Sequence, residues 1–160
     1  MSTDTTLIAR SREETWLPIL ELATEEVFEI MVGTRVKPVE KTESAGAGFT
    51  AMVGLAGALC GILTFSCDGK TAREVAKSML GAEIADSEEQ VSDALGEICN
   101  MIAGNFKNKL STAGKSCLLS VPTVIKGEEY SFRALADGEM LETVMEFKGA
   151  PLFVSLQLHS

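Results

Sequence analysis

The apolar residues between Val91 and Phe106 recur at the spacing of one face of an α-helix. At about 100° per residue, they fall within one narrow sector: Val91, Leu95, Ile98, Ile102 and Phe106. Ser87-Glu-Glu-Gln90 is a capping box, which predicts that the helix begins there. We expect the helix to run to about Thr112 and to end at Gly114. Because its single apolar face must be buried, this helix constrains the fold more than any other segment.

Stretches of alternating apolar residues before and after this helix predict β-strands. Phe49–Ala56 and Leu59–Phe65 are expected to form a hairpin. Four further strands are expected at Leu118–Ile125, Tyr130–Leu135, Leu141–Phe147 and Leu152–Leu158. Pro122 interrupts the first of these four and marks an edge or a bend. The order of elements predicts an α+β fold, an antiparallel β-sheet with long helices packed on one face.

Two other helices are predicted, and the chain is expected to form one domain. The first spans Thr15–Val32, with Thr15 as N-cap, Pro18 in the first turn and Gly33 as the stop. A capping box at Thr71-Ala-Arg-Glu74 predicts a short helix that stops at Gly81. A chain of 160 residues is the size of one domain. Residues 1–10 are polar and read as a flexible tail, followed by a single domain over residues 11–160.

The charge and the hydropathy pattern exclude several classes of partner. The net charge is −9, from 23 acidic and 14 basic residues. No basic stripe is available for a nucleic acid, and the sign disfavours an anionic membrane surface. The N-terminus lacks the apolar region of a signal peptide, and no segment reads as a membrane span. We therefore expect a cytoplasmic protein.

The cysteines and the one histidine exclude several kinds of site. The four cysteines lie far apart without a C-x-x-C pair, so a zinc site is not expected. His159 is the one histidine and lies next to the C-terminus, which leaves little for a Ser-His-Asp or Cys-His mechanism. The cysteines are expected to be reduced and packed as small hydrophobes.

The side of the long helix away from its apolar sector carries the candidate chemistry. Asp93, Glu97, Asn100 and Gly104 cluster there, and Gly96 lies nearby. Each glycine within a helix costs roughly 1 kcal/mol relative to alanine, which indicates that something approaches the backbone closely. An ordinary solvated face is the alternative interpretation. Asn105 falls nearer the apolar sector, and the pattern offers no reason for it.

Residues 23–33 and 94–104 align without gaps. Alanine, glutamate and glycine recur at the same offsets, and Glu29 stands where the second segment has Asn100. An ancient duplication and a chance match between two amphipathic helices both account for this alignment.

The spacing Asp93-x-x-x-Glu97-x-x-Asn100, followed by Pro122, resembles the signature of the CheC/CheX/FliY phosphatase family of bacterial chemotaxis. The surrounding sequence agrees, from Trp16-Leu-Pro18-Ile in the first predicted helix to the strand at 119–127. The resemblance covers about residues 14 to 158. One complete motif is present, as in CheX rather than CheC.

The resemblance implies a phosphatase acting on the aspartyl phosphate of a CheY-like response regulator. Asn100 would orient the attacking water, and Glu97 would pair with the partner's lysine. Asp93, Gly96 and Gly104 would contact the partner, although a plain surface role for Asp93 is equally compatible. No metal ligand set is evident, so Mg²⁺ is expected to come with the partner. The resemblance also implies a homodimer formed through the sheet.

Two other functions remain open from the sequence. A non-catalytic adaptor or flagellar-switch module of the same fold would bind a response regulator without hydrolysing its phosphate. An enzyme acting on a small molecule is less well supported, because no phosphate-binding loop or cofactor fingerprint is present. The sequence identifies neither the response regulator nor the pathway.

Overall fold

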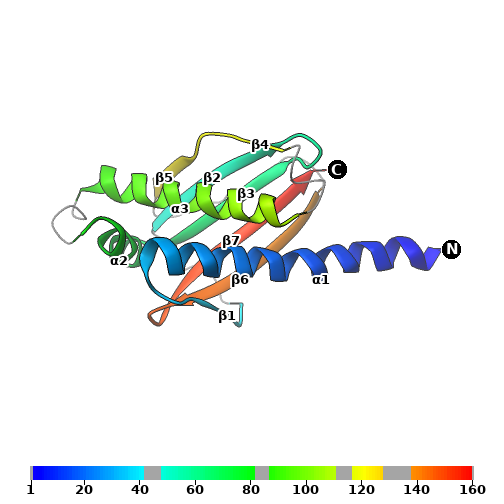
Figure 1. Cartoon of the computed structure of the whole chain (residues 1–160), viewed down its shortest axis with the longest axis horizontal. Helices are drawn as coiled ribbons and strands as arrows, with labels where there is room; N and C mark the ends of the chain where they lie inside the picture. The colour runs from blue at the N-terminus through cyan, green and yellow to red at the C-terminus, as the bar shows by residue number, and fades with distance from the viewer. Residues whose placement is uncertain (1, 42–47, 82–86, 111–116, 128–137, 160) are drawn as a thin grey trace.

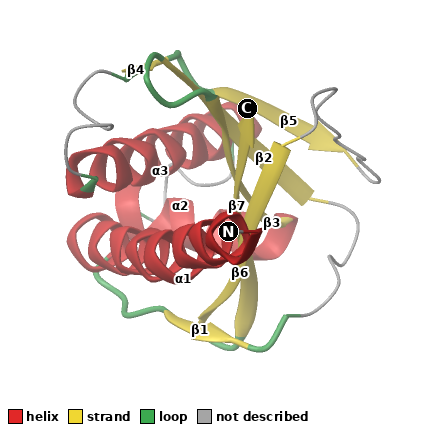
Figure 2. Ribbon diagram, turned by 90° about the vertical axis from the view of Figure 1, so that its right-hand side faces the viewer, coloured by secondary structure: helices red, strands yellow, loops and turns green. Residues whose placement is uncertain are grey.

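The computed structural model describes residues 2–41, 48–81, 87–110, 117–127 and 138–159, with the backbone alone for residues 2–13. The elements in chain order are α1 (Ser2–Val27), the π-helical turn η1 (Phe28–Val32), β1 (Lys37–Val39), β2 (Gly48–Ala56), β3 (Gly61–Asp68), α2 (Gly69–Leu80), α3 (Glu88–Lys109), β4 (Leu118–Leu119), β5 (Thr123–Gly127), β6 (Gly138–Phe147) and β7 (Ala150–His159). The described strands form one antiparallel sheet, and the three helices cover one of its faces (Figures 1 and 2). The predicted fold class is confirmed.

The sheet has the strand order β1-β6-β7-β3-β2, and β4 and β5 both pair with β2 at the far edge. The predicted hairpin is present as β2–β3, with Phe49 opposite Cys67 and Leu55 opposite Gly61. Strands β6 and β7 pair along their whole lengths around a tight turn at Lys148-Gly149, where both residues have positive φ. Alternate residues of β2, β3 and β7 are buried beneath the helices, as the period of two predicts.

The helix caps explain where the two later helices begin. Ser87 caps α3 as predicted, since its Oγ accepts a hydrogen bond from the Gln90 amide at 3.4 Å. Helix α2 begins earlier than predicted, because Asp68 rather than Thr71 is its N-cap. The Asp68 carboxylate accepts the Thr71 amide at 2.7 Å, which satisfies an amide that has no partner within the helix.

The first helix differs from its prediction at both ends. It begins at Ser2 rather than Thr15, so Pro18 lies in its interior. Residues of the predicted tail are thus helical in backbone from Ser2 onward, and the flexibility of the tail stays a prediction. The last turn widens into η1 and ends at Gly33, whose φ is 75° and whose amide donates to the Phe28 carbonyl. Gly33 is therefore the predicted stop, because glycine adopts this left-handed conformation without strain.

Two strand predictions change in the structure. Lys37–Val39 forms β1 against β6, a strand that the sequence did not predict. The predicted strand Leu118–Ile125 is divided into β4 and β5, and Pro122 lies in the break. The predicted strand Tyr130–Leu135 lies outside the described residues. Helix α3 was predicted to run to about Thr112, but it ends at Lys109, because Leu110 already has an extended backbone.

Candidate functional site

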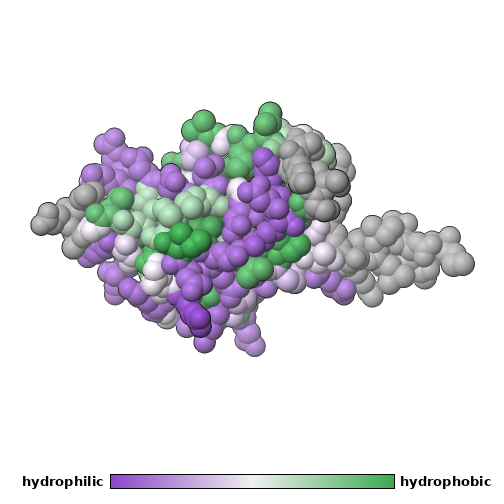
Figure 3. Space-filling view, viewed as in Figure 1, coloured by the Kyte–Doolittle hydropathy of each residue, from purple (hydrophilic) through white to green (hydrophobic). Residues whose placement is uncertain are grey.

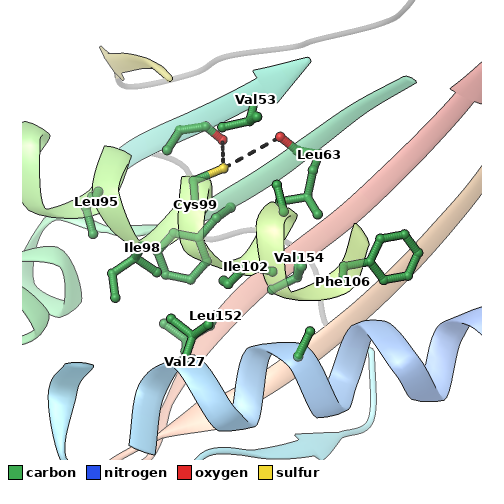
Figure 4. Close-up of a cluster of buried hydrophobic side chains, with 14 of the residues drawn as sticks. Val27, Val53, Leu63, Leu95, Ile98, Cys99, Ile102, Phe106, Leu152 and Val154 are labelled. Carbon is green, nitrogen blue, oxygen red and sulfur yellow. Dashed lines mark hydrogen bonds between the residues drawn. The ribbon is translucent and has the colours of Figure 1, made fainter. Parts of the chain in front are cut away.

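Helix α3 is held in one rotation about its axis by a fully buried apolar face. Leu95, Ile98, Ile102 and Phe106 have no exposed surface and face the sheet and α1 (Figure 4). The Cys99 thiol lies among them, 3.5 Å from the Ala51 carbonyl oxygen of β2. Turning the helix would expose this face to water at about 1.5–3 kcal/mol per side chain. The opposite side of α3 is therefore fixed toward the solvent.

The solvent side of α3 carries the predicted polar residues in one line, here called the α3 stripe: Asp93, Glu97, Asn100 and Gly104. Asp93 and Glu97 are exposed, and Asn100 is half-buried. Within the described part of the chain, none of these three side chains forms a hydrogen bond or an ion pair. Glu97 and Asn100 are one turn apart, roughly 4.5 Å along the axis, so one external group can contact both. The Glu97 carboxylate and the neighbouring Asn100 amide thus lie on the outward side of the helix, without a partner among the described residues.

Gly96 lies on the side of α3 that packs against Pro122 and strand β5. It is buried, and a Cβ placed on it would lie 3.3 Å from Val124 Cγ2 and 3.5 Å from Pro122 Cβ. We expected this glycine to give a partner room to approach. The chain's own strand β5 and Pro122 occupy that space instead. Packing within the fold therefore accounts for a small residue at this position, and contact of Gly96 with a partner stays a prediction.

Gly104 lies in the stripe itself and is half-buried. A Cβ at this position would have Leu119 Cδ1 as its nearest neighbour, at 3.8 Å. This is ordinary van der Waals contact, so packing does not require a glycine here. Contact of Gly104 with a partner stays a prediction.

The structure explains Asn105, which the helical pattern left unexplained. Its Nδ2 donates to the Ala23 carbonyl at 3.3 Å and to Glu26 Oε1 at 3.2 Å, both on α1. Lys109, one turn further along α3, forms an ion pair with Glu26. The hydrogen bonds from Lys109 and Asn105 hold the pKa of Glu26 below its ordinary value. This cluster joins α1 to α3 on a side of α3 that carries none of the stripe residues.

The two aligned segments also differ in structure. Glu26, the counterpart of Glu97, is engaged by Asn105 and Lys109 rather than presented to solvent alone. Glu29, the counterpart of Asn100, is exposed but lies in the π-helical turn η1. The first segment therefore presents no acid and amide pair comparable to that of α3.

The remaining chemistry of the described residues is limited. Among them, no three His, Cys, Asp or Glu side chains are grouped so as to hold a metal ion. None of the described helices is long and apolar enough to cross a membrane. All four cysteines are free thiols, and burial raises the pKa of Cys67 and of Cys99 to about 12.

A family model described as chemotaxis phosphatase CheX matches residues 49–146, more than half of the chain, including α3 and Pro122. The chain belongs to the CheX family. The CheY-P phosphatase CheX of Thermotoga maritima is 32% identical to it over 84 residues, which is 52% of this chain and 54% of the relative. The match thus spans about half the length of that curated CheX.

Solved CheX structures share the fold along nearly their whole length. CheX from Desulfovibrio desulfuricans has a TM-score of 0.79 and 26% identity, and the match covers 90% of this chain and 99% of that one. The CheX–CheY–BeF3–Mg²⁺ complex from Borrelia burgdorferi has a TM-score of 0.73 and 26% identity, covering 91% and 98%. The resemblance to CheX found in the sequence is confirmed.

Proposed function

We propose that this chain is a phosphatase that accelerates hydrolysis of the aspartyl phosphate on a CheY-like response regulator. The observation that carries the proposal is the pair Glu97 and Asn100, adjacent on the outward side of a rigid helix and without partners among the described residues. Membership of the CheX family supports it, and so does the presence of CheY in the Borrelia complex.

Asn100 is proposed to orient the attacking water. Its amide oxygen accepts a hydrogen bond from the water while its NH₂ group donates, and the side chain brings no negative charge toward the phosphoryl group. Positioning a water in line is the main contribution a protein makes to a loose phosphoryl-transfer transition state. A half-buried position suits this role, because α3 restricts the amide while one side remains accessible.

Glu97 is proposed to bind the lysine of the receiver's active site. A charge-assisted hydrogen bond between the carboxylate and an ammonium group would anchor α3 one turn from Asn100. Mg²⁺ is expected on the receiver, and the presence of Mg²⁺ together with CheY in the Borrelia complex supports this. Asp93 and Gly104 extend the contact along the stripe. The cytoplasm, where such receivers act, remains the expected location.

The test follows phosphate loss from a phosphorylated CheY-type receiver with the wild-type chain, Asn100→Ala and Asn108→Ala. We expect Asn100→Ala to lose acceleration by about a hundredfold or more, since a misplaced reactant costs that much, and to bind the receiver still. Asn108→Ala is the matched control, because Asn108 is an exposed amide on the same helix. Binding without acceleration by the wild-type chain would favour the non-catalytic adaptor.

We also propose that two copies form a homodimer through the sheet. Among the described residues, no helix covers the face of the sheet opposite α1, α2 and α3 (Figure 2). Met52, Ile62 and Phe153 lie on this face and are half-buried. A second copy would remove these apolar side chains from water. Sedimentation equilibrium of the wild-type chain tests this, and a monomer at micromolar concentration would contradict it.

A further inference from the structure

Lys107 continues the α3 stripe by one turn toward the C-terminal end of the helix. Seven residues at about 100° each make close to two full turns, so Lys107 lies on nearly the same side of the axis as Asn100. Hydrophilic side chains cover this end of α3 (Figure 3). The stripe and Lys107 therefore form one polar line along the outward side of the helix.

Lys107 differs from two other lysines near α3 in having no internal partner. Lys109 forms an ion pair with Glu26 on α1. Lys126 forms one with Glu88 at the start of α3. Lys107 is half-buried, and no residue in the described ranges forms a hydrogen bond or an ion pair with its ammonium group. In a chain of net charge −9, this lysine beside the candidate site keeps its charge available for an external anion.

The charges along this line have a fixed order. The acidic Asp93 and Glu97 come first, the neutral Asn100 lies between, and the basic Lys107 comes last. A complementary partner surface carries a basic group near Glu97 and an acidic group near Lys107. The opposite orientation would bring like charges together, which is unfavourable. The order of charges therefore favours one direction of the partner along α3.

The distance from Asn100 decides which anion Lys107 can bind. Seven residues correspond to roughly 10.5 Å along the helix axis. An extended lysine side chain spans only about 6 Å, because it contains five bonds of roughly 1.5 Å. The ammonium group therefore does not reach a phosphoryl group held at the Asn100 amide. A carboxylate on the partner surface beside the phosphorylated site is within its reach.

We propose that Lys107 is a docking residue that forms an ion pair with a carboxylate of the receiver, about 10 Å from the phosphorylated aspartate. This inference rests on the proposed function, which brings the receiver onto the stripe. Glu97 and Lys107 then hold the receiver on both sides of Asn100 and fix its direction. Lys107 acts on binding and not on the chemical step, because it does not touch the reacting atoms.

The experiment compares the wild-type chain with Lys107→Ala, Lys107→Glu and Lys37→Glu. Lys37 is the matched control, because it is exposed on β1, at the opposite edge of the sheet from β4, and its reversal changes the net charge by the same amount. Binding is measured to the CheY of the source organism, loaded with beryllofluoride and Mg²⁺, so that no hydrolysis is needed.

We expect Lys107→Ala to bind the loaded receiver about two- to fivefold more weakly, the range typical of losing a surface ion pair. Lys107→Glu should bind about tenfold more weakly, because repulsion replaces attraction. Lys107→Arg keeps the charge and should bind like wild type. Lys37→Glu should bind within about twofold of wild type.

Two further measurements separate docking from a structural role, since a last-turn lysine also interacts favourably with the helix dipole. The loss in Lys107→Glu should shrink at roughly 0.5 M salt, because salt screens the charges across the interface. In turnover, Lys107→Glu should raise the receiver concentration needed for half-maximal rate and leave the rate at saturation nearly unchanged. Asn100→Ala should do the reverse.

Unchanged binding by Lys107→Glu would overturn the proposal. An equal loss in Lys37→Glu would overturn it too, because the effect would then come from net charge alone, and so would a loss that salt does not reduce. If circular dichroism shows that Lys107→Glu is unfolded, Lys107→Ala decides by the same criteria. The two proposals fail separately: a wild-type chain that binds the loaded receiver through Lys107 without accelerating phosphate loss would refute the phosphatase and keep the docking residue.

Discussion

Replacing Gly104 with alanine tests whether this glycine serves the fold or the partner. Glycine within a helix costs about 1 kcal/mol relative to alanine. The added Cβ would meet Leu119 Cδ1 at 3.8 Å and nothing closer, so no strain opposes the gain. We expect Gly104→Ala to raise the free energy of unfolding by roughly 0.5–1 kcal/mol.

Gly96→Ala is the matched control in the same helix. It gains the same helix propensity, but its Cβ would lie 3.3 Å from Val124 Cγ2 and 3.5 Å from the Pro122 ring. Crowding in a packed interior costs about 1–3 kcal/mol, which cancels or exceeds the gain. Gly96→Ala is therefore expected to be less stable than Gly104→Ala by about 1 kcal/mol or more.

Urea unfolding followed by circular dichroism measures both variants, and thermal unfolding gives a second value. A change of 1 kcal/mol shifts the Tm of a domain of this size by about 2–4 °C. A destabilised Gly104→Ala, or a Gly96→Ala stabilised as much as Gly104→Ala, would refute the packing argument.

Gly104→Ala also tests whether the receiver binds close to this position. If the receiver approaches α3 closely at Gly104, the methyl group should weaken binding to the beryllofluoride-loaded receiver while the fold becomes more stable. Binding equal to wild type would remove Gly104 from the docking surface and leave the stability argument intact.

Two further predictions concern the cysteines and Glu26. A thiol reagent at pH 8 should label the exposed Cys60 in the native chain, while Cys67 and Cys99 stay protected by burial and by pKa values of about 12. Mass spectrometry of the labelled peptides distinguishes the three cysteines. Rapid labelling of Cys99 would contradict the burial of the apolar face of α3. Glu26→Gln should lower stability near neutral pH, because the depressed pKa of Glu26 reflects an ionised form stabilised in the folded state. That contribution is present above the ordinary value of 4.5 and is lost as the pH falls through the lower pKa of the folded state. The stability of variant and wild type should therefore converge below pH 4.5, and a constant difference at all pH values would contradict the role of the Glu26 charge.

Much of the candidate site was predictable because it depends on one helix. Helical periodicity places Asp93, Glu97 and Asn100 opposite the apolar sector whatever that sector packs against. The N-cap of α3 at Ser87 and the end of η1 at Gly33 likewise depend only on residues that are close in the chain. The start of α1 was missed because Pro18 is tolerated inside this helix, although proline usually marks a first turn.

The remaining features depend on residues distant in the chain. Gly96 was assigned to a partner because the sequence cannot show that Pro122 and Val124 fill the space beside it. Asn105 had no explanation until α1 brought Glu26 to it. Strand β1 is three residues long and carries a proline, so it has too few residues to show a period of two.

The sequence alone determined which residues of α3 and of the long strands β2 and β7 turn toward the core, since this follows from local backbone geometry. Tertiary structure decided which segments lie next to α3: Leu119 and Pro122 lie beside its Gly104 and Gly96, and α1 lies on its other side. These neighbours are set by packing between segments that are far apart in the chain, so the local spacing of residues cannot predict them.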